Sequence, residues 1–181
     1  MERYRIGDDA ALYFITFSVV DWLPIFVSEK PCRIFADSLR FCHEQKFLRV
    51  NAFVIMPTHF HAIVFDRDFN SGRLTQTLTD FRKYTGRMLA DYCDGHLASC
   101  FRENLRAAAG DDRERRVWQP SRHPEALTSE PFWRQKLDYL HANPVRKGLV
   151  IRPDYWRFSS AGFLLSDGAL PCDVPLTPVV W

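Results

Sequence analysis

The sequence predicts a single α+β domain in which an antiparallel β-sheet packs against helices. Length and composition support one core, because the chain has 181 residues, of which 46% are hydrophobic and 25% charged, as in ordinary globular domains. Apolar runs of strand length alternate with longer segments whose apolar residues recur at helical spacing. Two strand-like runs are separated by only Pro57 and Thr58, which fits an antiparallel pair with a tight connection.

The first half of the chain predicts strand, helix, strand, strand. Residues 11–20 are rich in aromatic and β-branched side chains and predict a central strand that is buried on both faces. Residues 31–45 form an amphipathic pattern with Pro31 suited to a first helical turn. Residues 48–56 and 59–65 are the two strands of the antiparallel pair.

The second half predicts two more helices and one short strand. Residues 74–92 carry a helical apolar face, whereas residues 94–116 are rich in small and charged side chains and predict a flexible insertion. A short strand is expected after Arg122, followed by a helix over residues 129–142 that Pro144 ends. From about residue 154 the proline-rich chain is expected to be an extended tail of the same domain, which spans residues 1–181.

Composition excludes several classes of protein and leaves the function open. The net charge is only +2, from 24 Lys and Arg against 22 Asp and Glu, so the total charge does not indicate a nucleic-acid binder. The five cysteines are widely spaced and contain no CxxC pair, which argues against a disulfide framework or a cysteine zinc site. No apolar leader follows residues 1–5, and no run is long enough to span a bilayer, so we expect a cytoplasmic protein without a membrane partner.

The first chemical motif is the pair His59 and His61. On a strand, residues at i and i+2 point to the same face, while Phe60 points to the other. Two imidazoles on one face can hold a divalent metal ion and leave coordination positions open for water and substrate. The alternative is a polar pair with no ligand role, which is the commoner meaning of an isolated HxH.

The second motif is Tyr139 and Asn143, which share one helix face at i and i+4. Tyrosine can act as a nucleophile and asparagine can supply a ligand oxygen. The alternative is that Tyr139 packs in the core and Asn143 caps the helix before Pro144.

Together these motifs resemble the single-tyrosine HUH transposase family, and in particular its REP-associated tyrosine transposases. The resemblance also covers residues 13–17, 51–61, 118–120, 139–150 and 154–160 in the family's order. The sequence departs from the family at Thr58, where asparagine or glutamate is usual, and in the length of the 94–116 segment.

The resemblance implies a ferredoxin-like antiparallel sheet, with the HUH motif on a central strand and the nucleophilic tyrosine on a C-terminal helix. It implies a metal-dependent endonuclease and strand transferase that cleaves single-stranded DNA near hairpins through a 5′-phosphotyrosine, without ATP. By motif position, Tyr139 is the nucleophile, and His59, His61 and Asn143 are the ligands of Mg²⁺ or Mn²⁺.

Clustered cations are the candidate DNA contacts. One cluster flanks the proposed nucleophile and another lies on the second helix, although solvated surface cations are the commoner case; these residues are Arg82, Lys83, Arg134, Lys136, Arg146 and Lys147. Trp118 and Trp133 could stack on unpaired bases, or pack in the core.

Two other functions stay open, and so does the assembly. The chain could be a domesticated hairpin-binding protein that has lost turnover, or a ferredoxin-like RNA-binding module, which would need neither motif. Both a monomer and a homodimer are compatible with the resemblance, and a DNA substrate would place the protein at the nucleoid.

Overall fold

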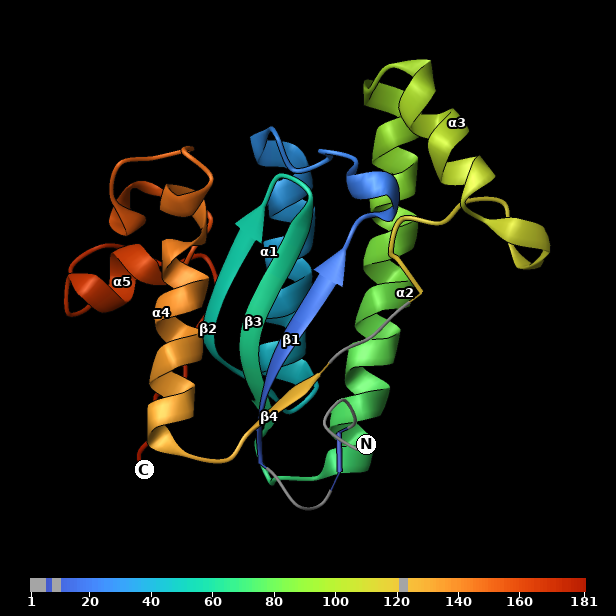
Figure 1. Ribbon diagram of the computed structural model, residues 1–181. Coiled ribbons are helices and arrows are strands. Elements are labelled where there is room, and N and C mark those ends of the chain that lie inside the picture. Colours follow the sequence, from blue (N-terminus) through green and yellow to red (C-terminus); the bar gives the residue numbers. More distant parts are fainter. Residues whose placement is uncertain (1–5, 8–10, 121–123) are drawn as a thin grey trace.

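The computed structural model contains one four-stranded antiparallel sheet with helices on both faces (Figure 1). It describes residues 6–7, 11–120 and 124–181. The strands lie in the order β2-β3-β1-β4, with every pair antiparallel. They are β1 (Leu12–Ser18), β2 (Leu48–Met56), β3 (His59–Asp66) and β4 (Glu125–Leu127). This βαββαβ order is ferredoxin-like, and it confirms the predicted α+β fold class.

Two long helices cover one face of the sheet and one helix covers the other. α1 (Glu29–Gln45) and α2 (Ser71–His96) lie over the face that holds the larger apolar core, whereas α4 (Glu130–Arg146) packs on the opposite face. The shorter elements are α3 (Ser99–Ala107), α5 (Ala161–Leu165) and three 3-10 turns, η1 (Val20–Trp22), η2 (Gly110–Asp112) and η3 (Pro153–Tyr155). The sheet is therefore buried on both sides.

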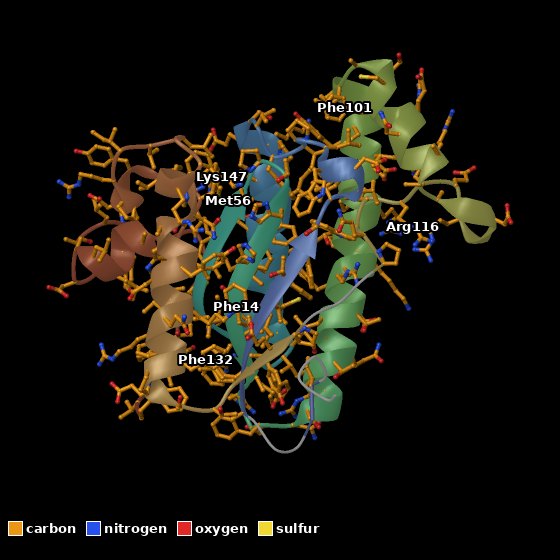
Figure 2. All side chains as sticks on the ribbon, in the orientation of Figure 1. Phe14, Met56, Phe101, Arg116, Phe132 and Lys147 are labelled. Atoms are coloured by element: carbon orange, nitrogen blue, oxygen red, sulfur yellow. The ribbon has the colours of Figure 1, made fainter. Side chains whose placement is uncertain are left out.

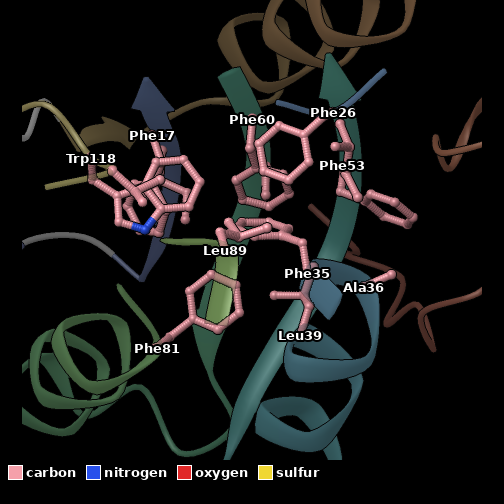
Figure 3. Close-up of a cluster of buried hydrophobic side chains, with 14 of the residues drawn as sticks. Phe17, Phe26, Phe35, Ala36, Leu39, Phe53, Phe60, Phe81, Leu89 and Trp118 are labelled. Atoms are coloured by element: carbon pink, nitrogen blue, oxygen red, sulfur yellow. The ribbon is translucent and has the colours of Figure 1, made fainter. Parts of the chain in front are cut away.

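Aromatic rings fill the larger core between the sheet and the two helices (Figure 3). Phe35 of α1 is fully buried, and its ring centroid lies 4.6 Å from that of Phe60, 4.8 Å from that of Phe81 and 5.6 Å from that of Trp118. Offset and edge-to-face rings at such distances add to the free energy gained by burial. The contact with Phe60 fixes which face of β3 points to the core.

Residues 94–116 differ from the predicted irregular insertion because they contain α3. The helix buries Leu105 completely, and Arg115 pairs with Asp91 and Asp94 of α2 at 2.8 and 2.7 Å. One apolar anchor and these ion pairs supply tertiary contacts that the charge-rich composition concealed. Helix α2 is also longer than predicted, since it begins at Ser71, where the Asn70 side chain accepts a hydrogen bond from Arg73 N.

The expected end of α4 at Pro144 is wrong, because the helix continues to Arg146. A proline inside a helix removes one backbone hydrogen bond, but the helix ends only where Gly148 adopts φ +68°. Leu149 N then donates to Pro144 O at 2.9 Å. Asn143 is consequently an internal helical residue and not a cap.

The last part of the chain covers the free edge of β2. Phe158 O accepts from Ile55 N at 2.9 Å, and Thr177 N donates to Val50 O at 2.7 Å. Asp173 anchors this segment to α1 through Arg33 at 2.9 Å. The predicted extended tail thus contains η3 and α5 and protects a sheet edge that would otherwise present unpaired backbone groups.

Two polar contacts attach α4 to β2 and its covering segment. At a β-bulge between Val50 and Ala52, Asn51 accepts from Trp133 Nε1 at 2.8 Å and donates to Thr177 O at 3.1 Å. Further along α4, His141 Nε2 lies 2.8 Å from Ser160 Oγ. Because these contacts lie at two points along α4, they fix its position along the sheet and its rotation about its own axis.

Some expectations concern residues outside the described part of the chain. They include residues 1–5, on which the expectation of no leader rests. The short strand expected after Arg122 lies within the described residues and is confirmed as β4. Among the described residues, no helix combines the length and the apolar character that a membrane crossing requires.

The buried His141 makes stability depend on pH. Burial lowers the pKa of His141 from 6.5 to about 4, so the unfolded chain takes up this proton at a higher pH than the folded protein does. The stabilisation is complete above about pH 6.5 and is lost as the pH falls to about 4, by at most about 3 kcal/mol.

We therefore expect the free energy of unfolding of His141→Gln to fall less between pH 6.5 and pH 4 than that of the wild-type protein. Urea unfolding at a series of pH values measures both curves, and their difference isolates His141 from the other buried histidines. Parallel curves would contradict this role.

Candidate active site

Strand β3 presents His59 and His61 on the face that α4 covers. The alternation of the strand places Phe60 in the core on the other side, while the two imidazole rings have centroids 4.7 Å apart at an interplanar angle of 70°. Both side chains are buried, at 8% and 6% exposure. The structure thus brings the two predicted ligands together in a sheltered position.

Threonine hydroxyls orient both rings. Thr58 Oγ1 lies 3.0 Å from His59 Nδ1, and Thr16 Oγ1 of the neighbouring β1 lies 2.7 Å from His61 Nδ1. Among the described residues, neither Nε2 atom has a hydrogen-bond partner, and neither is completely shielded from solvent. In the tautomer whose Nδ1–H donates to the hydroxyl, each Nε2 lone pair is left for a metal ion.

The environment keeps both histidines neutral. Burial, followed by the charge of Lys147, lowers the pKa of His59 to about 4. Burial, followed by His59 and Lys136, lowers the pKa of His61 to about 3. Since metal ions bind the neutral imidazole, both rings are in the binding form at neutral pH.

Tyr139 of α4 stands beside the histidine pair and does not pack in the core. Its side chain is 38% exposed, and its ring centroid lies 5.6 Å from that of His61 and 6.1 Å from that of Phe14. The Arg146 guanidinium lies 5.1 Å from the centre of the tyrosine ring. This position excludes the alternative in which Tyr139 is only a core residue.

Asn143 lies one turn after Tyr139 and is buried. Its Nδ2 donates to Tyr139 O at 3.2 Å, which leaves the amide oxygen as the atom with ligand chemistry. No hydrogen bond joins Asn143 to either histidine within the described residues. No cluster of three or more His, Cys, Asp or Glu side chains suited to a metal occurs in that part of the chain either, so a third protein ligand would be of another type, such as this amide.

The cations predicted around α4 fall into two groups. Arg134 pairs with Glu130 one turn earlier at 2.6 Å, and Lys136 pairs with Glu125 of β4 at 2.5 Å. Arg146 and Lys147 are exposed, and Figure 2 shows Lys147 near Met56, at the end of the sheet where β3 begins. Of these four cations, the two without a carboxylate partner among the described residues therefore lie at the C-terminal end of α4.

A second basic surface lies on the other side of the sheet. A cavity of about 570 Å³ between α2 and residues 113–120 is lined by six cations and one acidic side chain, namely Arg82, Lys83, Arg87, Arg113, Arg115, Arg116 and Glu114. Arg82 is partly buried and donates to Gln119 O at 2.5 Å, whereas Lys83 and Arg87 are exposed. We call this cavity the α2 groove.

Sequence reasoning missed several residues of the site. Thr16 is 45 positions from His61 and joins it only through strand pairing, so no local pattern marks it. Of the candidates for base stacking, Trp118 is buried in the larger core and Trp133 is partly buried against the smaller one. An exposed indole, that of Trp22, lies near the histidines, with its ring centroid 6.0 Å from that of His59.

Comparisons with known proteins agree with the fold and with the family that the sequence resembles. No family model matches the chain. A curated REP-associated tyrosine transposase from Escherichia coli (strain K12) is 25% identical over 124 residues, which are 68% of this chain but only 61% of that relative's length.

A solved structure of a REP-associated tyrosine transposase bound to a REP hairpin is similar over 100% of this chain and 93% of that chain, with a TM-score of 0.65 and 18% identity. At this identity the likeness shows the fold. The chain is thus similar in sequence to one REP-associated tyrosine transposase and similar in fold to the solved structure of another, the group whose motifs it resembles.

Proposed function

We propose that this protein is a transposase-type endonuclease and strand transferase that acts on single-stranded DNA next to hairpins. The observation that carries the proposal is that the ring of Tyr139 lies beside His61, which itself contacts His59. Both histidines are neutral, and their Nε2 atoms make no hydrogen bond among the described residues. A nucleophile beside two ligand nitrogens in one sheltered place suits metal-assisted cleavage of a phosphodiester through a covalent intermediate. The similarity to REP-associated tyrosine transposases supports the same activity.

The donor set fits a divalent metal ion, with His59 and His61 as ligands and Asn143 as the proposed third. When bound, Mg²⁺ or Mn²⁺ supplies positive charge that polarises a phosphate. Thr16 and Thr58 hold the imidazoles in their tautomers and orientations.

Tyr139 attacks the phosphorus of a phosphodiester and loses its hydroxyl proton. The new bond joins the tyrosine oxygen to the 5′-phosphate, and the bond that breaks releases a free 3′-hydroxyl, which takes up a proton. Because the phosphotyrosine retains the energy of the ester bond, a 3′-hydroxyl can reverse the step without ATP. Arg146 against the tyrosine ring and Lys147 near His59 favour the anionic phosphate and the developing tyrosinate.

The site is assembled within one chain, since Tyr139 and both histidines belong to the same molecule. A second copy is therefore not required to complete the site, and both a monomer and a homodimer stay compatible with it. With DNA as the substrate, we expect the protein to work in the cytoplasm, at the nucleoid.

We assign the hairpin stem to the α2 groove. Lys83 and Arg87 of α2 are exposed cations in this groove, as is Arg113, and a row of cations can follow a phosphate backbone without reading its sequence. Arg82 donates to Gln119 O, and its guanidinium lies 5.2 Å from the centre of the Phe17 ring. It therefore adds positive charge to the wall of the groove from a fixed position. Arg134 and Lys136 already have carboxylate partners, so we expect a smaller share of binding from them.

Tyr139→Phe should abolish the covalent adduct and lower cleavage on the order of a thousandfold or more, while hairpin affinity changes by less than about twofold because the ring is kept. A labelled oligonucleotide incubated with Mn²⁺ and run on a denaturing gel measures the adduct, and Tyr155→Phe, at another exposed tyrosine, is the matched control. Adduct formation by the Tyr139 variant would show that the nucleophile is wrong.

The same assay separates the second candidate function. If the protein binds hairpins but has lost turnover, the unsubstituted protein will bind the DNA and form no adduct, and Tyr139→Phe will change neither result.

Thr16→Val should weaken Mn²⁺ binding about 10- to 100-fold, because it removes the hydroxyl that orients His61. Calorimetric titration of the metal alone measures the affinity. Thr75→Val on α2, where the hydroxyl bonds only a helical carbonyl, is the control. Equal affinities for the two variants would argue against a metal site at His61.

Lys83→Glu should weaken hairpin binding and reduce the slope of log affinity against log salt by about one. Lys46→Glu makes the same charge change on an exposed residue outside the groove. Binding measured by fluorescence anisotropy over a range of salt concentrations compares them, and similar losses in both variants would contradict the assignment of the groove.

A further inference from the structure

The turn after β1 holds an exposed indole beside the histidine pair. Trp22 is 58% exposed, and its ring stands edge-on to His59, with centroids 6.0 Å apart at 84°. Ring contacts then continue from His59 to His61 at 4.7 Å and from His61 to Tyr139 at 5.6 Å. Trp22 and Tyr139 therefore flank the two imidazoles.

The backbone of this turn is strained, and its neighbours hold it in place. Asp21 and Trp22 have φ values of +50° and +52°, a left-handed conformation that is unfavourable for a residue other than glycine. Val19 N donates to Thr58 O at 2.9 Å, and Val20 N donates to Val117 O at 2.8 Å. The turn is thus pinned to the residue just before His59.

This turn holds a large apolar side chain in solvent next to the proposed site for an unpaired strand. Backbone strain that surrounding contacts maintain is concentrated at functional positions. Exposed aromatic side chains in single-strand binding proteins stack on bases, with little preference for sequence because every base has a π-face. The neighbouring Val19 and Val20 are buried, so the turn already has its apolar anchors without the indole.

We propose that Trp22 stacks on the unpaired base of a nucleotide that flanks the phosphate attacked by Tyr139. The inference rests on the proposed function and deepens it, because it makes Trp22 a positioning residue that places the strand across the histidine pair. Stacking requires an unpaired base, so Trp22 also selects single-stranded DNA over duplex at this site.

The test measures binding in a Tyr139→Phe background, in which no adduct forms. The probe is a hairpin oligonucleotide with a single-stranded flank, either intact or with one abasic nucleotide at each flank position in turn. We expect Trp22→Ala to weaken binding of the intact probe about tenfold. One abasic position should cause a similar loss in the Tyr139→Phe protein and little further loss once Trp22 is also replaced.

Two variants control for other roles of the side chain. Trp22→Phe should recover part of the affinity because it keeps an aromatic face, and Trp181→Ala, at another exposed tryptophan, should leave the abasic penalty unchanged. If the indole only supported His59 by packing, the abasic nucleotide would lower the binding affinity equally with and without Trp22. This result would overturn the inference. If the probe binds tightly but the losses from the abasic nucleotide and from Trp22→Ala simply add, the stacking is refuted and the proposed function is not. If the wild-type protein does not bind the intact probe, both the stacking and the proposed function are refuted.

Discussion

The site depends on the register of β3, which decides which of its side chains point to each of the two covered faces of the sheet. Phe60 is fully buried against Phe35 and Phe17, so the residues on either side of it must point to the opposite face. A shift of one residue would exchange the faces of the whole strand, placing two histidines in an aromatic core and a phenylalanine beside Tyr139. Core packing and chemistry are thus set by the same alternation.

The opposite face is completed by a helix whose position depends on polar contacts. The bulge at Asn51 turns an amide toward Trp133, and Ser160 joins His141 to the backbone of Phe53. Both contacts lie on the buried side of α4, which leaves Tyr139 at its edge. The covering segment of β2 therefore has two roles, because it closes a sheet edge and supplies the partner that holds the tyrosine helix.

Much of this fold could be predicted because strands buried on both faces leave a strong pattern. The bounds of β2 follow directly from the apolar run 48–56, and Pro57 and Thr58 mark the connection. Prediction failed where tertiary contacts outweighed local preference. Within residues 94–116, Ser99–Ala107 form α3, where Leu105 is buried, and the ion pairs of Arg115 attach the following segment to α2. Helix α4 continues through Pro144 to Arg146 and ends just before Gly148, whose φ is +68°.

The candidate site was predictable only in part for the same reason. His59, His61 and Tyr139 are visible as spacings, and the structure places their rings in contact. Thr16 reaches His61 through strand pairing, and Trp22 reaches His59 through a left-handed turn. Neither relation has a signature in the linear sequence, so the side chains that orient and flank the site could be found only in three dimensions.

The central claim is that the histidine pair and Tyr139 form one centre for phosphodiester cleavage. The most direct measurement is to incubate the protein with Mn²⁺ and hairpin-flanked single-stranded DNA, digest it, and identify the residue that carries the DNA by tandem mass spectrometry. The account predicts a 5′-phosphate on Tyr139 that is absent when His59 and His61 are replaced by alanine. A phosphate on another residue, or an adduct that persists without the histidines, would contradict it.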